Sequence, residues 1–430
     1  MPESKVSEKP GILESTSRRR FLARSAAAGA SATAGLALPA AALAEAAPAD
    51  LPPNVPSWMR RQGRGFLNPA YGLPSPHEAQ VVRKLPTASA AFPTATRTPL
   101  QSLFGSVTPN GLFFERHHAG VPAIDPEQHR LMIHGLVDRP LLLSVKDLMR
   151  FPSVSRVHFI ECSGNSATEW KGPGKGTVQD LHGLISSAEW TGVLLSTVLA
   201  EAGLKPSAAW VLAEGADAAG MTRSVPLAKA MDDAILVYGQ NGEMLRPEQG
   251  YPLRLLLPGY EGNMNIKWLR RLKLGDAPFQ TREETSKYTD LMPDGSARQF
   301  TFEMDAKSVI TSPSAGMRLT DKGFHEITGI AWSGRGRIAR VDISTDGARR
   351  WHEATLDGPT LSRAVTRFRF PWNWQGDPAI LQSRAVDETG YVQPGRSELI
   401  AARGVNSYYH YNGIQSWRID QDGAVSNIHV

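Results

Sequence analysis

The chain has 430 residues, of which 41% are hydrophobic and 21% charged, and its formal net charge is +5. Six of its 47 basic and three of its 42 acidic residues lie in the first 44 positions, so the rest carries a formal charge of only +2, which argues against a nucleic-acid-binding protein. The single cysteine, Cys162, excludes an intramolecular disulfide, and the length suffices for two domains stabilised by apolar burial.

The N-terminus has the pattern of an export signal. Residues 17–22 read SRRRFL, residues 25–44 are uncharged and rich in alanine, and Ala42-Leu43-Ala44 is a pattern that signal peptidase cuts. The paired arginines favour the twin-arginine route. We therefore expect residues 1–44 to be removed and the mature protein to be periplasmic, without a membrane span. An N-terminal membrane anchor is the alternative, although the run is only weakly apolar.

An arm and a mixed region of helices and strands follow. Residues 45–100 are rich in Pro, Ala and Ser and predict an arm wrapped over the body of the protein. Residues 131–152 predict a strand, a turn and a short helix with Ser144 as its N-cap. Residues 193–202 predict a second helix, which Gly203 ends. Short apolar runs predict buried strands at residues 209–214, 234–238 and 251–257.

The last third of the chain predicts a β-sandwich without helices. In residues 338–344, Ala339, Val341 and Ile343 alternate with the other side chains and give one apolar face. A turn at Asp346-Gly347 and a returning strand at residues 351–356 are expected to follow. Further short strands are expected at residues 327–332, 363–370 and 380–386. An immunoglobulin-like sandwich fits residues 302–430, without the disulfide of antibody domains.

The cysteine lies in the segment HFIECSGNSATEW, residues 158–170, and allows three interpretations. It is a small core residue, a nucleophile paired with a histidine, or a ligand for a soft metal. Phe159-Ile160 predicts the end of a buried strand, and Ser163-Gly164-Asn165 predicts a turn. The thiol is therefore expected at a strand end, where a rigid scaffold commonly presents active-site groups.

Several motifs, taken in chain order, resemble the sulfite oxidase family of molybdenum enzymes. Glu161-Cys-Ser-Gly-Asn165 is similar to the cysteine motif of that family, and Phe114-Glu-Arg-His-His118 is similar to its F-x-R-N-H segment. The other similar segments are His129–Val137, Asn241-Gly242, Gly250–Arg254, Pro258-Gly259 and Ile266–Leu269. The resemblance covers about residues 100–430.

The resemblance implies an α+β fold and a domain order. A mixed α/β molybdopterin-binding domain of sulfite oxidase type would span residues 101–300. An immunoglobulin-like β-sandwich dimerisation domain would span residues 301–430. The signal peptide at residues 1–44 and the arm at residues 45–100 would precede them.

The resemblance also implies the site residues. Cys162 would be the metal ligand, the only one that the protein supplies, and a molybdopterin dithiolene would supply the other sulfur ligands. Tyr288 and Arg116 would lie at the reacting centre, and Arg367 would bind substrate from the sandwich, with Arg369 close enough to confuse that match. The residues expected to bind the molybdenum-molybdopterin cofactor are Phe114, Arg116, His117, His118, Cys162, Asp217, Gln249, Arg254, Asn265, Ile266 and Lys267. Arg254 and Lys267 would take the phosphate end, which suits a guanidinium and an ammonium.

Three positions depart from the family pattern. Ala167 stands where sulfite oxidases have a substrate-binding arginine, Gln249 replaces a cofactor-binding histidine, and Lys287 replaces an acidic residue. Losing one charge-assisted contact weakens anion binding by about 1.5–3 kcal/mol. We therefore expect an unusual sulfur substrate for this chain.

The resemblance implies partners and leaves alternatives open. The chain has no CxxCH haem-attachment motif, so a separate c-type cytochrome subunit, expected to be dihaem, would accept the electrons. The chain itself would form a homodimer within a hetero-oligomer, and its substrate would be sulfite or sulfane sulfur held on a carrier protein. The alternatives are a free sulfite dehydrogenase, a periplasmic methionine-sulfoxide reductase, and a non-catalytic secreted sandwich protein with a buried thiol.

Overall fold

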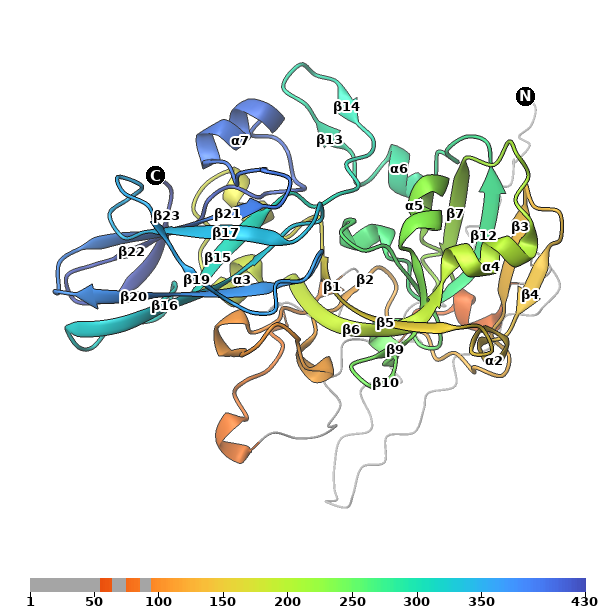
Figure 1. The fold of residues 1–430 in the computed structure, drawn as a ribbon, viewed down its shortest axis with the longest axis horizontal. Helices are drawn as coiled ribbons and strands as arrows, with labels where there is room; N and C mark the ends of the chain where they lie inside the picture. The colour runs from red at the N-terminus through yellow and green to blue at the C-terminus, as the bar shows by residue number, and fades with distance from the viewer. Residues whose placement is uncertain (1–54, 64–74, 86–93) are drawn as a thin grey trace, which may run out of the picture. The chain divides into compact units, whose positions relative to one another are not determined.

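The structure is a computed structural model that describes residues 55–63, 75–85 and 94–430 (Figure 1). The predicted export signal and most of the predicted arm lie outside the described residues. The described residues form one compact unit. The described part of the arm contains two short 3-10 helices, η2 (Ser57–Arg60) and η3 (Pro76–Glu78). The arm ends at β1 (Thr94–Ala95), which pairs with β2 (Arg116–His117).

Residues 94–300, called here the N-terminal domain, contain two larger sheets. The first has the order β10-β9-β6-β5, with β11 also paired to β9, and is antiparallel. The second has the order β4-β3-β12-β7-β8, in which only β3 and β12 run parallel. The strands are β3 (Leu131–Gly135), β4 (Leu141–Leu143), β5 (Ser153–Glu161), β6 (Ile185–Leu194), β7 (Trp210–Gly215), β8 (Thr222–Pro226), β9 (Ile235–Gln240), β10 (Glu243–Met244), β11 (Arg254–Leu256), β12 (Leu269–Gly275), and the hairpin β13 (Asp290–Leu291) and β14 (Ala297–Arg298).

Short helices connect these strands. The α-helices are α2 (Val145–Leu148), α3 (Val178–His182), α4 (Leu195–Ala202), α5 (Leu227–Asp232) and α6 (Arg282–Thr285). The 3-10 helices are η4 (Leu100–Ser102), η5 (Asn110–Leu112), η6 (Ala167–Trp170), η7 (Pro247–Gln249) and η8 (Gly262–Met264). The predicted N-cap of α2 is confirmed, because the Ser144 Oγ accepts from the Asp147 amide at 3.1 Å and the Asp147 carboxylate accepts from the Ser144 amide at 2.9 Å. The predicted helix at residues 193–202 begins later, at Leu195, since Val193 and Leu194 end β6, and it stops at Gly203 as expected.

Residues 301–430, called here the C-terminal domain, form the predicted two-sheet sandwich. One sheet has the order β15-β16-β20-β19 and the other β18-β17-β21-β22-β23, all antiparallel. The strands are β15 (Lys307–Ser312), β16 (Gly323–Trp332), β17 (Ile338–Ser344), β18 (His352–Glu353), β19 (Thr355–Asp357), β20 (Thr366–Trp374), β21 (Ala379–Asp387), β22 (Ser416–Ile419) and β23 (Val425–Ile428). The mixed α+β fold followed by a β-sandwich is thus confirmed.

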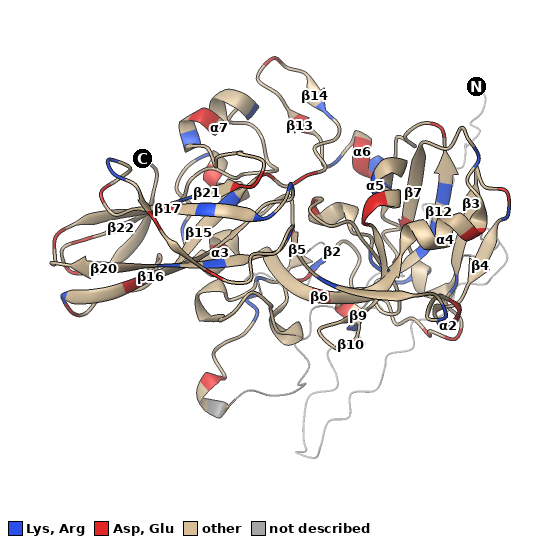
Figure 2. Ribbon diagram, in the orientation of Figure 1, with Lys and Arg blue, Asp and Glu red and all other residues tan. Residues whose placement is uncertain are grey.

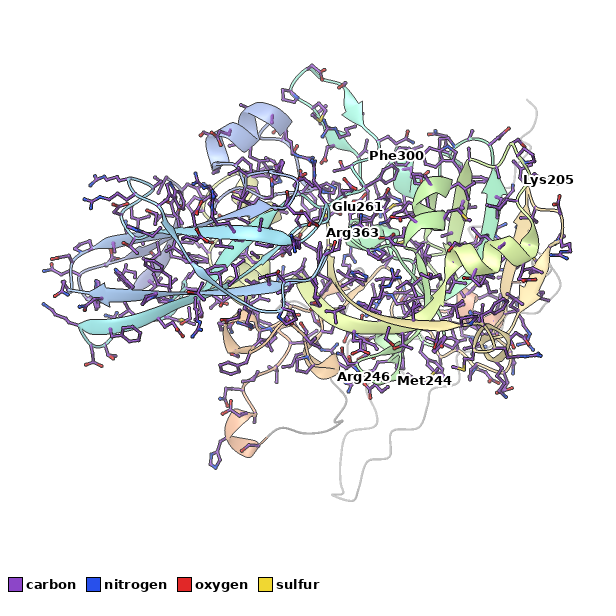
Figure 3. The ribbon with its side chains drawn as sticks, viewed as in Figure 1. Lys205, Met244, Arg246, Glu261, Phe300 and Arg363 are labelled. Carbon is purple, nitrogen blue, oxygen red and sulfur yellow. The ribbon has the colours of Figure 1, made fainter. Side chains whose placement is uncertain are left out.

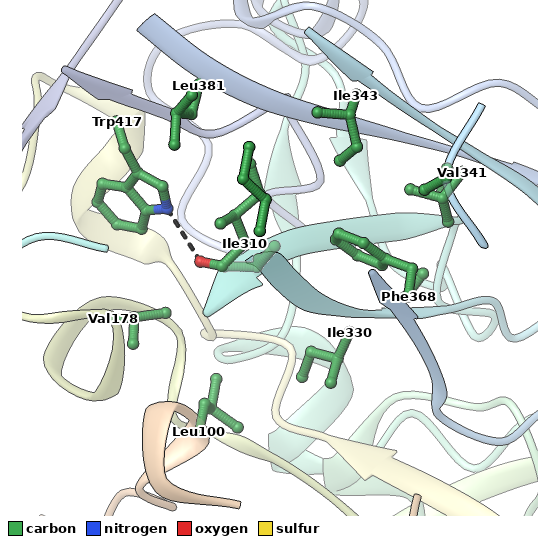
Figure 4. Packing of buried hydrophobic residues seen from close by; sticks show 14 of the residues in the cluster. Leu100, Val178, Ile310, Ile330, Val341, Ile343, Phe368, Leu381 and Trp417 are labelled. Atoms are coloured by element: carbon green, nitrogen blue, oxygen red, sulfur yellow. Dashed lines mark hydrogen bonds between the residues drawn. The ribbon is translucent and has the colours of Figure 1, made fainter. Parts of the chain in front are cut away.

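Apolar side chains from both sheets fill the sandwich (Figure 4). Trp417 crosses this core, and its indole nitrogen donates to the Ile310 carbonyl at 2.9 Å. The same cluster extends into the N-terminal domain, where it includes Phe159 of β5, Val178 of α3 and Ile185 of β6. The cores of the two domains therefore meet beside the strand that leads to Cys162.

Three details of the sandwich differ from the prediction. A bulge between Ile338 and Arg340 in β17 turns Ile338 inward and leaves Ala339 exposed, so the simple alternation is wrong there. The predicted returning strand divides, because β18 pairs with β17 whereas β19 pairs with β20 in the opposite sheet. The expectation of no helix is also wrong. Helix α7 (Arg396–Arg403) lies outside the sheets (Figure 1). Its Leu399 packs against Trp170 and Tyr411 in a small cluster separate from the sandwich core.

Charges of both signs are spread over the two domains (Figure 2). Several of them are buried as ion pairs, including Lys229 with Asp233 at 2.7 Å. In the part of the chain that the structure describes, no helix combines the length and hydropathy needed to cross a bilayer.

A close approach of two loops joins the domains. Gly259 follows β11 and Gly334 follows β16, and a Cβ on Gly259 would lie 2.2 Å from the Gly334 carbonyl oxygen. Nearby, Arg363 of the C-terminal domain pairs with Asp233, and Figure 3 labels Arg363 and Glu261 at this junction. The junction therefore needs a residue without a side chain at position 259.

We expect Gly259→Ala to destabilise the protein more than Gly242→Ala does. Both glycines have nearly the same positive φ, +80° and +79°, but nothing lies within 4 Å of a Cβ on Gly242. The positive φ costs each alanine variant roughly 1–2 kcal/mol. The steric clash adds about 1–3 kcal/mol for Gly259→Ala alone. Urea denaturation of both variants measures the difference, and equal losses would contradict the close packing.

Candidate functional site

Two adjoining pockets meet at Cys162. The inner pocket has a cavity volume of about 80 Å³ and the outer pocket one of about 600 Å³. They share Arg116, His118, Cys162 and Tyr288. The inner pocket is also lined by Phe113, Phe114, His117, Ile160, Asp217, Met221, Gln249, Arg254, Gly262, Asn263, Asn265, Ile266, Lys267 and Trp268. A group bound in the inner pocket can thus be reached from the outer one at these four shared side chains.

Cys162 directly follows β5, at the predicted strand end. Its amide donates to the Leu184 carbonyl at 3.0 Å, and its carbonyl accepts from the Asn165 amide at 2.8 Å, which closes the predicted turn. Burial raises the pKa of the thiol, while the nearby Arg116 guanidinium and the Gly164 amide act in the opposite direction. As a whole residue, Cys162 is half-buried. The site therefore presents one thiol, and Arg116 partly offsets the penalty that burial places on its thiolate form.

His118 and Tyr288 form a neutral pair beside the sulfur. The Tyr288 hydroxyl lies 3.0 Å from the His118 Nε2. Burial, with help from Arg116, lowers the pKa of His118 to about 3. Burial also raises the pKa of Tyr288, so its hydroxyl stays protonated. Tyr288 has a φ of 54°, a strained value for a non-glycine residue and one that is often found at functional sites.

Lys267 connects three loops of the inner pocket. Its Nζ donates to the carbonyls of Arg116 and Glu248, each at 3.0 Å, and lies 2.7 Å from the His117 Nδ1. The other ring nitrogen of His117 lies 2.8 Å from a Glu115 carboxylate oxygen. Burial lowers the pKa of Lys267 to about 7 and that of His117 well below its usual value. His117 is therefore neutral, which suits a ring that accepts from Lys267 and donates to Glu115.

Arg254 is a buried cation with unused donor capacity. Its two terminal nitrogens donate to the carbonyls of Gln249, at 3.0 Å, and Asn265, at 3.3 Å, and the guanidinium lies 4.9 Å from the Trp190 ring centroid. Among the described residues, its Nε is buried without a hydrogen-bond partner. Burial lowers its pKa to about 9. An unpaired polar atom on a buried cation is the feature expected where an anionic ligand binds.

The remaining predicted residues shape the inner pocket in different ways. The side-chain Nε2 of Gln249 donates to the Phe114 carbonyl at 3.0 Å. The Asn265 side chain faces its own loop, accepting from the Leu257 amide at 2.7 Å and donating to the Glu261 carbonyl at 3.0 Å, so it orders the loop. Burial raises the pKa of Asp217, against the attraction of Lys267.

The structure brings together all the predicted cofactor-binding residues and Tyr288, since each lines the inner pocket. It does not bring Arg367 to them. Arg367 lines a separate small pocket with Leu100 and Ile330, and its Nε donates to the Gly105 carbonyl. Arg369 pairs with Asp357 at 3.0 Å. Neither arginine lies at Cys162 in this chain.

Residues 408–411, with the sequence YYHY, were not predicted to contribute. Tyr408 and Tyr409 line the outer pocket together with Ala167 and Lys287. The His410 amide donates to the Ser163 carbonyl at 2.7 Å. No motif in the sequence marks this segment, because its contacts with the cysteine turn span about 250 positions of the chain and arise only on folding.

Comparisons with known proteins agree with this geometry. The family model described as "Oxidoreductase molybdopterin binding domain" matches residues 118–283, and "Mo-co oxidoreductase dimerisation domain" matches residues 298–416. Mitochondrial sulfite oxidases of Mus musculus and Homo sapiens are each 31% identical, over 80% of this chain and 74% of theirs. The crystal structure of the sulfane dehydrogenase SoxCD from Paracoccus pantotrophus has a TM-score of 0.82 and 49% identity, covering 84% of this chain and 93% of that one.

We expect Cys162→Ser to keep the fold and to lose oxidoreductase activity by more than about 100-fold. Serine is close in volume, and the turn depends on backbone hydrogen bonds rather than on the thiol. Loss of a metal ligand should exceed the roughly 10- to 100-fold cost of losing a group that only orients one. Activity per bound molybdenum measures the effect, with circular dichroism as the fold control. Full turnover in the variant would refute the ligand role.

Proposed function

This chain belongs to the sulfite oxidase family of molybdenum enzymes, and we propose that it is the molybdenum subunit of a Sox-type sulfane (sulfite) dehydrogenase. Its cofactor is molybdenum bound to molybdopterin, as the matching family domain and the sulfite oxidase relatives imply. The observation that carries the choice within the family is the outer pocket, where Ala167 lines the wall in place of an arginine.

The residues of the inner pocket fit the cofactor. The orphaned Nε of Arg254 and the ammonium of Lys267 suit its phosphate end, because a guanidinium and an ammonium form strong charge-assisted bonds to phosphate. Cys162 would supply a thiolate donor at the boundary with the outer pocket. The loops of Phe114–His118 and Asn265–Lys267 would enclose the pterin between these two ends.

The chain's own residues have separate tasks in turnover. When bound, the cofactor supplies oxygen-atom transfer to sulfur and stores two electrons. Cys162 would bind the metal, and the Arg116 guanidinium would help to stabilise its thiolate form. Tyr288 and His118 hold a hydroxyl proton at the boundary of the two pockets, where it could be donated to an oxygen of the substrate and so orient the substrate.

The outer pocket supports sulfur bound to a carrier protein as the substrate. Its cavity volume of about 600 Å³ is larger than a sulfite ion needs, and Tyr408 in its wall is exposed to solvent. Arg116 and Lys287 still line it, and these cations favour the alternative of free sulfite. Methionine-sulfoxide reduction, which reverses the oxygen transfer, remains the third candidate.

Electrons would leave to a separate c-type cytochrome subunit, expected to be dihaem. The C-terminal domain would form the homodimer, supported by its match to a dimerisation domain. The proposed site of action is the periplasm, reached through the twin-arginine signal in residues 1–44.

The test is a steady-state assay of cytochrome c reduction with sulfite and with a carrier protein loaded with thiosulfate. We expect the loaded carrier to give the higher kcat/KM, because the outer pocket lacks the arginine that would hold a dianion. A higher kcat/KM for sulfite would identify a free sulfite dehydrogenase. Reduction of methionine sulfoxide, without reduction of cytochrome c by either donor, would identify the reductase.

We expect Ala167→Arg to improve the use of sulfite. A new charge-assisted contact contributes about 1.5–3 kcal/mol, which corresponds to a fall in the KM for sulfite of roughly 10- to 150-fold. The larger side chain should also narrow the outer pocket and slow oxidation of the carrier-bound substrate. Ala167→Gln, of similar length without charge, is the matched control. Equal KM values for the two variants would show that charge at this position does not select the substrate.

A further inference from the structure

A buried lysine of the C-terminal domain holds both ends of the cysteine turn. Lys307 opens β15 and is 1% exposed. Its Nζ donates to the Glu161 carboxylate at 3.2 Å and to the Ser166 Oγ at 2.8 Å. Glu161 directly precedes Cys162, and Ser166 ends the turn that follows. One ammonium therefore connects the two flanks of the only protein ligand to the metal.

Glu161 has two further donors. The side-chain Nδ2 of Asn165, from the same turn, donates to its Oε1 at 2.9 Å. The Trp332 indole nitrogen, from β16, lies 2.6 Å from its Oε2. The carboxylate is 1% exposed, and every donor to it comes from the turn or from the C-terminal domain.

We infer that Lys307 and Trp332 are positioning residues, which act through Glu161 and Ser166 to set the direction in which Cys162 presents its sulfur to molybdenum. The inference depends on the cofactor, not on which sulfur compound is the substrate. It also assigns a role in the active site to a domain whose matching family model names only dimerisation.

The hydrogen bonds around Ser166 have one consistent direction. Lys307 can only donate, so the Ser166 Oγ accepts a hydrogen bond from it. The Ser166 hydroxyl in turn donates a hydrogen bond to the His182 Nδ1, 2.6 Å away. The His182 Nε2 then donates to the Gln415 Oε1 at 2.9 Å. Burial lowers the pKa of His182 to about 3, which agrees with this neutral ring. These bonds hold Ser166 at a φ of 66°, a strained value for serine.

The same network reaches the wall of the outer pocket. Gln415 pairs with Asn427, whose amide donates to the Glu169 Oε1 at 3.0 Å, while the His429 Nε2 lies 2.9 Å from the Glu169 Oε2. Glu169 belongs to η6, the segment that also carries Ala167. The C-terminal domain therefore holds the cysteine turn and the adjoining substrate wall through one connected set of bonds.

Stability alone is a poor explanation for this arrangement. The free-energy cost of desolvating a buried ion pair is often about as large as the attraction between its charges. Replacing both partners by apolar groups therefore frequently leaves the stability of the protein unchanged. A buried pair does, however, restrict a turn to one arrangement, because any other leaves a charge unpaired. Removing a group that orients a metal ligand typically lowers activity or metal affinity by about 10- to 100-fold.

The test is the double variant Glu161→Gln/Lys307→Met, which removes both charges and keeps the volumes. In the molybdenum-loaded protein we expect a shift in the g-values of the Mo(V) electron paramagnetic resonance signal. We also expect a fall in kcat of about 10- to 100-fold with little change in KM. Trp332→Phe removes only one donor and should shift the signal in the same way by a smaller amount, so it serves if the double variant fails to fold.

A second measurement uses the single cysteine of the chain. In cofactor-free protein, iodoacetamide labels Cys162 alone, and we expect faster labelling in both variants than in the parent. Lys229→Met is the matched control, because Lys229 is also a buried lysine. Its partner Asp233 is still paired with Arg363 in that variant. The control should leave the signal, kcat and labelling rate unchanged. Folded, loaded variants with the parental signal and kcat, or a control that shifts equally, would overturn the inference.

Discussion

The buried carboxylate of Glu161 is the constraint on which the arrangement of the site depends. It accepts hydrogen bonds from Asn165 in its own turn and from Lys307 and Trp332 in the other domain. An unpaired buried charge costs several kcal/mol, so any movement of one domain relative to the turn is opposed by the loss of these bonds. Phe159, two residues earlier on the same strand, lies in the core shared with the sandwich. The end of β5 is therefore held from two sides, and the cysteine follows at the next position. In this way a chain without disulfides would hold its proposed metal ligand rigidly.

The inner pocket adds a second electrostatic constraint. Burial lowers the pKa of Arg254 to about 9 and that of Lys267 to about 7, so both groups are held in surroundings that disfavour their charged forms. An anionic phosphate beside them would raise both pKa values, because an opposite charge favours the protonated cation. The free-energy cost of desolvating these side chains would thus be offset by a cofactor phosphate bound beside them. A ligand that binds only the folded protein stabilises it by mass action. We therefore regard the cofactor as part of the charge balance of this domain as well as of its chemistry.

Local signals in the sequence predicted local structure well and long-range structure poorly. The N-cap at Ser144 and the stop at Gly203 depend on residues a few positions apart, and both were predicted. The bulge in β17 depends on its partner strand β21, and α7 depends on packing against Trp170, so neither left a readable pattern. The cofactor residues could be named only because several ordered motifs resembled one family. Tyr408 and Lys307 stand outside those motifs and reach the turn through tertiary contacts. Arg367 was matched through the family resemblance, with Arg369 as a rival, and in this chain it lies in a different pocket.

The composition of the outer pocket bears directly on the choice of substrate. The Ser166 hydroxyl connects Lys307 with His182 through two hydrogen bonds. These bonds fix the start of the pocket wall to which the next residue, Ala167, belongs. Ala167 then contributes a methyl group where a guanidinium would hold an anion, and Tyr408 and Tyr409 contribute rings. A small dianion such as sulfite gains most of its affinity from charge-assisted bonds, and here it loses one of them. A sulfur atom carried on a protein gains affinity from contacts of its carrier as well, and so depends less on that cation. The missing charge and the wide pocket thus favour the same class of substrate for independent physical reasons.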